Sequence, residues 1–322
     1  MHLLIPFAAS QSEGCQSALA GLKLPNLQKL LTRLQALPLD MGDERSLTPP
    51  HERALARAEG LPLADGLVPW AAWQAKRSSE SAWAFISLCH WRVGTHHVLM
   101  SQLPLPDFTA QESSELMLAM QPYFEEDGIT LYEDQPGRWL AHGEIFGDLP
   151  SASLDRVIGR HVKPWLPTGV KATALLRLQN EMQMLLYTHP VNDAREAIGL
   201  TPANSFWIHG TGKLNRSPEP VLIDPLAQLT PSLPDAKPAI VITTLRYAAL
   251  AENWPTWARI WQEIDACEGP ALLRAQSRGE PLTLTLCGER NAQSWVAKRR
   301  SIVQKINSIF DRQSISGVLG QL

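Results

Sequence analysis

Apolar residues recur along the chain at two spacings, one typical of buried strands and one typical of helices. Short, nearly continuous apolar runs favour strands that are buried on both faces. They occur at residues 3–7, 82–89, 97–100, 129–132, 138–141, 205–208, 239–244 and 282–287. Apolar residues three and four positions apart predict helices with one buried face. They occur at residues 26–37, 54–59, 175–189, 255–267 and 293–310, and in a further helix that contains Leu116, Met117, Met120 and Phe124.

Capping signals mark several of the predicted helix ends. Thr109 followed by Glu112 forms a capping-box pattern. Thr48 precedes two prolines and is expected to cap the helix at 54–59. A short helix at 194–198 has Asn192 or Asp193 available as its cap and is expected to stop at Gly199.

The order of these elements predicts an α/β domain that carries an inserted lobe. Residues 79–151 contain two strands, a helix and two more strands, which is the order of a small α+β lobe. Residues 1–78 and 152–322 alternate strands and helices, as expected for a core domain with one mostly parallel sheet and flanking helices. Six prolines between residues 218 and 238 predict an extended connection.

Composition narrows the class of protein without pointing to a partner. The 322 residues are 44% hydrophobic and 19% charged, as in an ordinary globular chain. A net charge of -3 gives no overall attraction to nucleic acid or to an anionic membrane, so we expect neither partner. The four cysteines are widely spaced and form no metal-binding pair. With no signal peptide or long apolar span recognised, we expect a cytoplasmic protein.

The densest group of polar candidates lies between residues 189 and 213. A Gly-Thr-Gly-Lys segment follows the predicted strand at 205–208, and such a loop can bind an anion through backbone amides and an ammonium group. We therefore expect it to bind a ligand together with polar residues nearby in sequence. The candidates are His189, Asn192, Arg195, Asn204, His209 and Lys213. In the structural alternative, Asn192 caps a helix, Asn204 satisfies loop backbone and Arg195 pairs with a carboxylate.

Two segments of this region resemble one known family. HPVNDAR at 189–195 and PANSFWIHGTGKL at 202–214 resemble the archaeal-type cofactor-independent phosphoglycerate mutases of the alkaline phosphatase superfamily. LPNLQKL at 24–30, GITLY at 128–132 and RWL at 138–140 are similar to further segments of that superfamily. The whole chain also looks like a group of uncharacterised proteobacterial proteins labelled phosphoglycerate mutase or grouped with a regulator of pathogenicity factors.

The resemblance implies an alkaline phosphatase-like fold and a phosphoryl transfer that uses a serine nucleophile and two metals held by Asp and His. This chain lacks the expected ligands. The first strand is followed by Ala8-Ala9-Ser10-Gln11-Ser12, and no Asp-His dipeptide occurs anywhere. Two later strands lead into Leu245-Arg246 and Gly288-Glu289-Arg290. We therefore expect a divergent relative that has lost the two-metal centre, needs no cofactor, and has a regulatory role or binds a small phosphorylated or carboxylated ligand.

Other candidates and functions stay open. Cys89, His90, His96 and His97 contain enough donors for a metal, although polar strand-end histidines are the more frequent explanation. Arg156 and Arg160, with His161 and Lys163, form a basic cluster that could bind phosphate or simply be a solvated helix face. The alternatives are an active mutase or related phosphotransfer enzyme with unrecognised ligands, and a scaffold that binds a protein partner.

Overall fold

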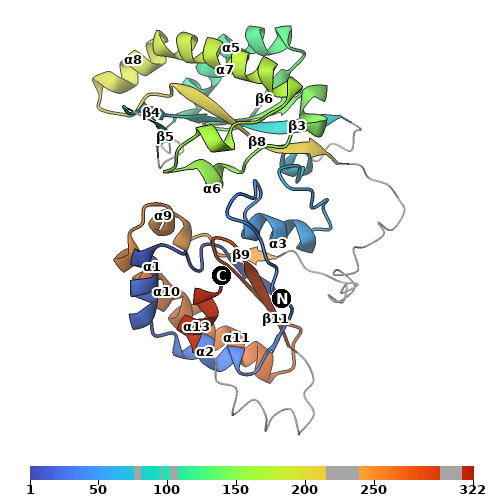
Figure 1. Ribbon diagram of the computed structural model, residues 1–322, viewed down its shortest axis with the longest axis vertical. Helices are drawn as coiled ribbons and strands as arrows, with labels where there is room; N and C mark the ends of the chain where they lie inside the picture. The colour runs from blue at the N-terminus through green and yellow to red at the C-terminus, as the bar shows by residue number, and fades with distance from the viewer. Residues whose placement is uncertain (76–80, 96, 102–107, 215–238, 298–313) are drawn as a thin grey trace. The chain divides into compact units, whose positions relative to one another are not determined.

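A computed structural model describes residues 1–75, 81–95, 97–101, 108–214, 239–297 and 314–322. The chain divides into two compact units (Figure 1). The first unit comprises Met1–Arg45, Pro49–Gly60 and Leu222–Leu322, and the second comprises Ser46–Thr48 and Leu61–Val221. Residues 152–213, assigned above to the core domain, therefore group with the second unit.

The first unit is built on a mixed five-stranded sheet in the order β2-β11-β10-β1-β9. β1 lies between β10 and β9 and is parallel to both, whereas β11 is antiparallel to both β10 and β2. An α/β architecture is confirmed, but this sheet is mixed rather than mostly parallel. Its strands are β1 (His2–Ile5), β2 (Gln35–Ala36), β9 (Ile240–Val241), β10 (Thr283–Cys287) and β11 (Ala292–Val296).

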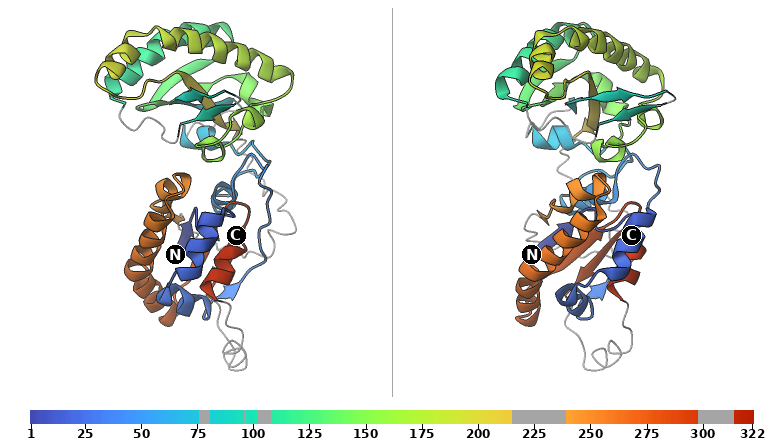
Figure 2. Two further views of the ribbon diagram at one scale, coloured as in Figure 1. Left: turned by 60° about the vertical axis from the view of Figure 1, so that its left-hand side comes forward. Right: turned by 90° about the vertical axis from the view of Figure 1, so that its left-hand side faces the viewer.

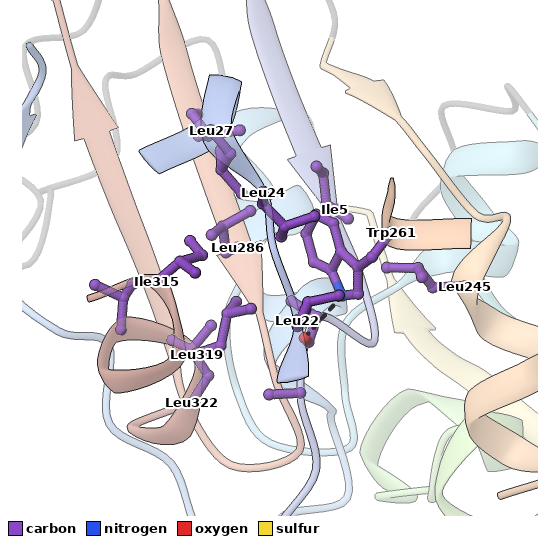
Figure 3. Packing of buried hydrophobic residues seen from close by; sticks show 14 of the residues in the cluster. Ile5, Leu22, Leu24, Leu27, Leu245, Trp261, Leu286, Ile315, Leu319 and Leu322 are labelled. Atoms are coloured by element: carbon purple, nitrogen blue, oxygen red, sulfur yellow. Dashed lines mark hydrogen bonds between the residues drawn. The ribbon is translucent and has the colours of Figure 1, made fainter. Parts of the chain in front are cut away.

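Side-chain alternation decides which helices cover which face of this sheet. Leu3, Ile5, Leu284 and Leu286 point into one large core, which also contains residues of α1, α2, α10, α11 and α13 (Figure 3). Leu4 and Cys287 point to the opposite face and contact α3 through Ala54. The helices are α1 (Glu13–Gly21), α2 (Pro25–Leu31), α3 (Pro50–Ala58), α9 (Leu245–Leu250), α10 (Trp254–Cys267), α11 (Gly269–Ser277) and α13 (Ile315–Gly320).

Replacing Gly288 with alanine is expected to lower the free energy of unfolding of the first unit by about 1–3 kcal/mol, the usual range for overpacking. A Cβ atom at this position would lie 2.5 Å from both the main-chain carbon and the Cβ of Leu322. Leu322 is fully buried, so it has little room to move away. Chemical denaturation monitored by tryptophan fluorescence measures the loss.

Gly21→Ala is the matched control for this glycine substitution. A Cβ at Gly21 meets nothing within 4 Å, and the residue closes α1. Alanine in a helix is about 0.5–1 kcal/mol more favourable than glycine, so the control is expected to be neutral or stabilising. Equal stabilities of the two variants would contradict the packing of Leu322 against Gly288.

The second unit is an antiparallel four-stranded sheet, in the order β6-β7-β3-β8, beside a separate hairpin of β4 and β5. Helices α5 and α7 cover one face of the sheet (Figures 1 and 2), where Ala84, Ile86 and Leu88 are buried. The shorter α4 packs near Phe85 on the other face. The strands are β3 (Ala82–Cys89), β4 (Trp91–Val93), β5 (Val98–Met100), β6 (Thr130–Gln135), β7 (Arg138–His142) and β8 (Ser205–Lys213). The helices are α4 (Trp70–Gln74), α5 (Ala110–Glu126), α6 (Leu154–Val157), α7 (Val170–Tyr187) and α8 (Pro190–Ala197), with 3-10 turns η1 (Glu144–Asp148) and η2 (Lys163–Trp165).

The segment expected to be an anion-binding loop is part of a strand. β8 continues from Ser205 through Lys213 and pairs with β3 along its length. The pairing shifts register between Trp83 and Phe85, where β8 has one additional residue. Gly210 has a φ of 63°, a left-handed conformation that glycine adopts without strain. The glycines therefore accommodate a β-bulge, and the loop prediction is wrong.

Several local predictions had mixed outcomes. The capping box of Thr109 and Glu112 is confirmed. Thr48 does not cap α3, because its hydroxyl accepts a hydrogen bond from Gly66 N and Pro49 occupies the cap position. The cap of α8 is His189 rather than Asn192 or Asp193.

The predicted helices at 26–37 and 293–310 need correction. The first ends at Leu31 because the chain turns into the short strand β2. The start of the second is β11, which pairs with β10 through Trp295 and its neighbours. Its residues from 298 onward, like the whole proline-rich connection at 218–238, lie outside the described residues. Among the helices described, none has the length and apolar character required to span a membrane.

Candidate functional site

Three segments that follow parallel strands meet at one edge of the first unit's sheet. Residues 6–12 follow β1, residues 242–245 follow β9 and residues 288–291 follow β10. Hydrogen bonds from Ala8 N to Cys287 O and from Ile242 N to Leu4 O join them at 2.8 and 2.9 Å. Since β9 and β10 lie on opposite sides of β1, this edge is a topological switch point, where α/β sheets commonly bind ligands.

Local hydrogen bonds fix the segment that follows β1. Phe7 has a φ of 56°, which turns the chain sharply at the end of the strand. Ser12 caps α1 by accepting from Cys15 N, and Ser12 N donates to the hydroxyl of Ser10 at 3.2 Å. The side chain of Ser10 is thus held at the edge rather than free to rotate.

Two tryptophans of α10 hold the backbone of the segment that follows β1 from the side of the hydrophobic core. The indole Nε1 of Trp257 donates to Phe7 O at 2.9 Å. The indole Nε1 of Trp261 donates to Ala8 O at 3.2 Å, the dashed line in Figure 3. Both side chains are fully buried, so their hydrogen bonds tie the backbone of the edge to the hydrophobic core.

The acidic residue in these three segments is Glu289, and neighbouring groups already bind it. Its Oε2 accepts hydrogen bonds from Ser10 Oγ at 3.0 Å and from Gln11 N at 3.2 Å. A nearby carboxylate, Asp40, forms ion pairs with Arg53 and Arg57. The carboxylates of Glu289 and Asp40 are therefore bound by donors and cations of the protein itself.

The donor set does not fit the two metals that the resemblance implies. Two divalent ions about 3.5–4 Å apart need several Asp and His ligands around them. Within the described ranges, no group of three or more His, Cys, Asp or Glu side chains is arranged to hold a metal ion. His51, the histidine whose ring lies 5.0 Å from that of Phe7, has no such cluster around it.

The thiols near this edge are not poised as nucleophiles. Burial raises the pKa of Cys287, with a further increase from the carboxylate of Asp40. Burial also raises the pKa of Cys15, although a hydrogen bond from Ser10 N opposes the increase. Because the thiolate is the reactive form, both cysteines are suited to packing.

The predicted residues His189, Asn192, Arg195 and Asn204 lie where β8 begins, and three of them hold the second unit together. The side-chain amide of Asn192 donates to Leu186 O and to Ala203 O, each at 2.7 Å. Its Oδ1 accepts a hydrogen bond from Ala203 N at 3.0 Å. Asn204 accepts from Trp91 N and donates to Trp91 O, so it completes the edge of β4. The contacts of Asn204 match the structural alternative stated above, whereas Asn192 joins two segments and is not the cap of α8. A ligand-binding role of these residues stays a prediction.

Arg195 has the carboxylate partner that the structural alternative expected. Its Nη1 lies 3.1 Å from Glu112 Oε1, and its Nε donates to Thr201 O at 3.1 Å. The guanidinium also lies 3.9 Å from the centroid of the Phe108 ring. Burial alone would raise the pKa of Glu112, but hydrogen bonds from Thr109 and Arg195 outweigh it and lower that pKa.

His209 and Lys213 lie further along β8 and do not join the first four residues. Lys213 is opposite Ala82, at the start of β3, whereas Asn204 N bonds Cys89 O at its end. Lys213 Nζ is 2.7 Å from Glu144 Oε2, and this hydrogen bond lowers the pKa of Glu144. His209 Nε2 is 2.9 Å from Ser87 Oγ. The predicted set is therefore spread along a strand rather than gathered in one site.

The remaining candidates also separate. Arg156 is buried in α6, whereas Arg160 is half-buried beside β5, where its carbonyl accepts from Met100 N. Cys89 is fully buried, and burial raises its pKa. His90 Nδ1 is 2.9 Å from Pro202 O, while His97 lies beside His161. His96 is outside the described residues, and no metal cluster involves the other three within the described part of the chain.

Sequence reasoning named Ser10 and Glu289 only as residues following strands, and it missed that they bond each other. The two residues are 279 positions apart. The available signal was that both follow strands of a parallel pair, whose carboxyl ends must lie at the same edge.

Comparisons with known proteins give limited matches. No protein-family model matches the chain. The 2,3-bisphosphoglycerate-independent phosphoglycerate mutase of Methanothrix thermoacetophila is 36% identical over 114 residues, which is 35% of this chain and 29% of that protein. A probable enzyme of the same name from Geobacter sulfurreducens is 28% identical over 123 residues, which is 37% of this chain and 30% of that protein. The aligned part thus spans less than a third of these curated relatives.

Two solved structures are also similar. One is a cofactor-independent phosphoglycerate mutase from Thermoplasma acidophilum, with 12% identity, a TM-score of 0.36, and coverage of 100% of this chain and 98% of that one. The other is the PH0037 protein from Pyrococcus horikoshii, with 13% identity, a TM-score of 0.39, and coverage of 95% and 91%. TM-scores this low carry no argument about a shared fold. Over about a third of its length, the sequence of the chain is similar to 2,3-bisphosphoglycerate-independent phosphoglycerate mutases.

Proposed function

We propose that this chain is a phosphoglycerate mutase-like protein that binds a small phosphorylated or carboxylated ligand without two-metal phosphoryl transfer. The ligand binds at the carboxyl edge of β10, β1 and β9, and binding serves a regulatory role in the cytoplasm. The observation that carries the proposal is that Glu289 Oε2 accepts hydrogen bonds from Ser10 Oγ and Gln11 N. The carboxylate of this edge is therefore bound by groups of the protein itself.

The same edge supplies donors suited to an anion. Thr243 and Thr244 are exposed immediately after β9, and Arg246 follows them in the first turn of α9. Hydroxyl groups and a guanidinium donate hydrogen bonds to phosphate or carboxylate oxygens, and the guanidinium can donate two at once. This chemistry favours binding and orientation of an anion.

The test combines metal analysis, a mutase assay and ligand binding on the full chain. Metal content is measured by mass spectrometry, turnover of 3-phosphoglycerate is measured with and without manganese, and 3-phosphoglycerate binding is measured by calorimetry. We expect no turnover in either condition and saturable binding. A ligand at a hundred times its dissociation constant stabilises the folded state by about 2.7 kcal/mol, so a rise in melting temperature gives a second readout.

Arg246→Ala is expected to weaken 3-phosphoglycerate binding at least tenfold, because it removes the guanidinium that follows Thr243 and Thr244 in the first turn of α9. Arg259→Ala is the control, since Arg259 lies on α10 and is exposed beside Glu263. Stoichiometric metal with manganese-dependent turnover would overturn the proposal. Absence of binding, or an equal effect of the two variants, would also overturn it.

A further inference from the structure

Two basic segments that are far apart in sequence form one surface in the second unit. The hairpin of β4 and β5 lies beside residues 158–163, which follow α6. Leu99 pairs with His161 in antiparallel fashion, and Val162 N donates to Val98 O at 3.0 Å. Residues 158–162 therefore lie against β5 through two isolated bridges, one antiparallel at Leu99 and His161 and one parallel at Met100 and Ile158.

Pairing of these segments decides which side chains share a face. Arg92 is opposite Leu99, and Leu99 is opposite His161, so these three lie in a row on the same face. His97 lies two positions before Leu99, where Gly94 N donates to its carbonyl in the turn between β4 and β5, and Lys163 begins the 3-10 turn η2 two positions after His161. The rings of His97 and His161 confirm the proximity, with centroids 6.2 Å apart at an interplanar angle of 78°. We call Arg92, His97, His161 and Lys163 the cationic face.

The cationic face is accessible and has no acidic residue in its own segments. Arg92, His97 and Lys163 are exposed, and His161 is half-buried. Residues 82–106 and residues 156–180 contain no aspartate or glutamate, although the chain as a whole has 32 acidic residues. Arg92 and Lys163 therefore have no carboxylate within their own segments, although the chain as a whole carries a net charge of -3.

We infer that the cationic face binds single-stranded nucleic acid. Arginine guanidinium planes and histidine rings can stack on unpaired bases, and lysine contacts phosphates. Three of the four side chains of the cationic face can stack in this way, which favours nucleotides over an acidic peptide or a lipid headgroup. The exposed position of Arg92, His97 and Lys163 also disfavours a small ligand, since small molecules bind in concave sites.

This inference differs from the expectation drawn from the sequence. The overall charge of the sequence gives no reason to expect a nucleic-acid partner. The basic cluster at 156–163 is recognisable in the sequence, but its contact with residues 91–100 is not. The bridge between Leu99 and His161 and the contact of the His97 and His161 rings place the hairpin beside that cluster. The site is separate in sequence from the edge proposed for the small ligand, so each proposal stands or falls without the other.

The test is fluorescence anisotropy of labelled oligonucleotides, titrated with the full chain. Oligo-uridine and oligo-thymidine probes of about 15 nucleotides fit the usual size of single-strand sites and distinguish RNA from DNA. We expect a dissociation constant in the range of about 10⁻⁴ to 10⁻⁶ M near physiological salt. Neutralisation of about two phosphates by Arg92 and Lys163 gives a slope of roughly -1.4 for the logarithm of the binding constant against the logarithm of salt concentration.

The double variant Arg92→Glu with Lys163→Glu is expected to weaken binding at least tenfold. The control, Lys23→Glu with Lys29→Glu, makes the same change in net charge at exposed positions of the first unit. Arg92→Lys keeps the charge but removes the guanidinium plane, and a loss of about threefold or more is expected if stacking contributes. Circular dichroism confirms that each variant is folded.

Equal weakening by the two double variants would overturn the inference, because binding would then follow overall charge. Absence of binding at a protein concentration of about 100 µM, the weak end of non-specific affinity, would do the same. Binding to anionic vesicles through Arg92 and Lys163, without binding to either oligonucleotide, would overturn it in favour of a membrane surface.

Discussion

Replacing Arg195 with alanine is expected to lower the free energy of unfolding of the second unit by about 1.5–3 kcal/mol, the range for hydrogen bonds to a charged group. The Arg195 side chain is 2% exposed and binds both Glu112 and the carbonyl of Thr201. It also packs on the ring of Phe108. The alanine variant leaves Thr201 O without this donor and opens a space beneath α8. Urea unfolding followed by circular dichroism measures the loss.

Arg177→Ala is the control for this prediction. Arg177 also forms an ion pair, with Asp127 at 2.6 Å, but its side chain is 60% exposed. Exposed pairs contribute about 0–1 kcal/mol, so the control should lose little. Similar losses in the two variants would mean that burial of Arg195 does not determine its contribution.

The pH dependence of stability gives a second readout of the same pair. The pKa of Glu112 is lowered in the folded protein, so its stabilisation is present above its unfolded pKa of about 4.3 and is lost as pH falls through the folded value. Arg195→Ala removes part of the lowering. The variant should therefore show a smaller acid-induced loss of stability than the parent protein.

Elements with a complete local signature were predictable from the sequence. α5 begins at its capping box, and α10 buries Trp257 and Trp261 on the face that the three-and-four spacing indicates. β1, β3 and β10 appear at the predicted apolar runs. In each of these elements, the local sequence signals all favour the same secondary structure within a few consecutive residues.

Elements whose conformation depends on a distant partner were not predictable. The polar half of β8 contains Gly210 and Gly212, which favour a loop, yet pairing with β3 makes it a strand. The start of the predicted C-terminal helix is β11, because its pairing with β10 satisfies the backbone. The edge that holds Ser10 beside Glu289 likewise depends on strand order, which periodicity does not encode.

The segments that resemble phosphoglycerate mutases have a structural use in this chain. Asn192 joins the end of α7 to the chain before β8, and Asn204 bonds both backbone groups of Trp91. Similarity in these segments can therefore persist because the second unit needs them to fold. The similarity of these segments therefore does not by itself require a bound substrate.

Replacing Trp257 with alanine is expected to destabilise the first unit by about 3–5 kcal/mol, the usual cost of removing a buried tryptophan. The side chain is fully buried and makes edge-on contacts with Trp254 and Trp261. Its Nε1 also donates to Phe7 O, so the substitution should release the segment that carries Ser10. Thermal and urea unfolding measure the first effect, and calorimetric titration with 3-phosphoglycerate measures the second.

Two further variants separate packing from positioning at Trp257. Trp257→Phe keeps most of the volume but removes the donor to Phe7 O, and should cost about 1–3 kcal/mol. Trp73→Ala is the control, because Trp73 is 41% exposed and lies in the second unit. If the phenylalanine variant weakens 3-phosphoglycerate binding at low temperature, where it is fully folded, then the hydrogen bond to Phe7 positions the edge. Unchanged binding would limit Trp257 to a packing role, since the core would then support the edge without its indole nitrogen.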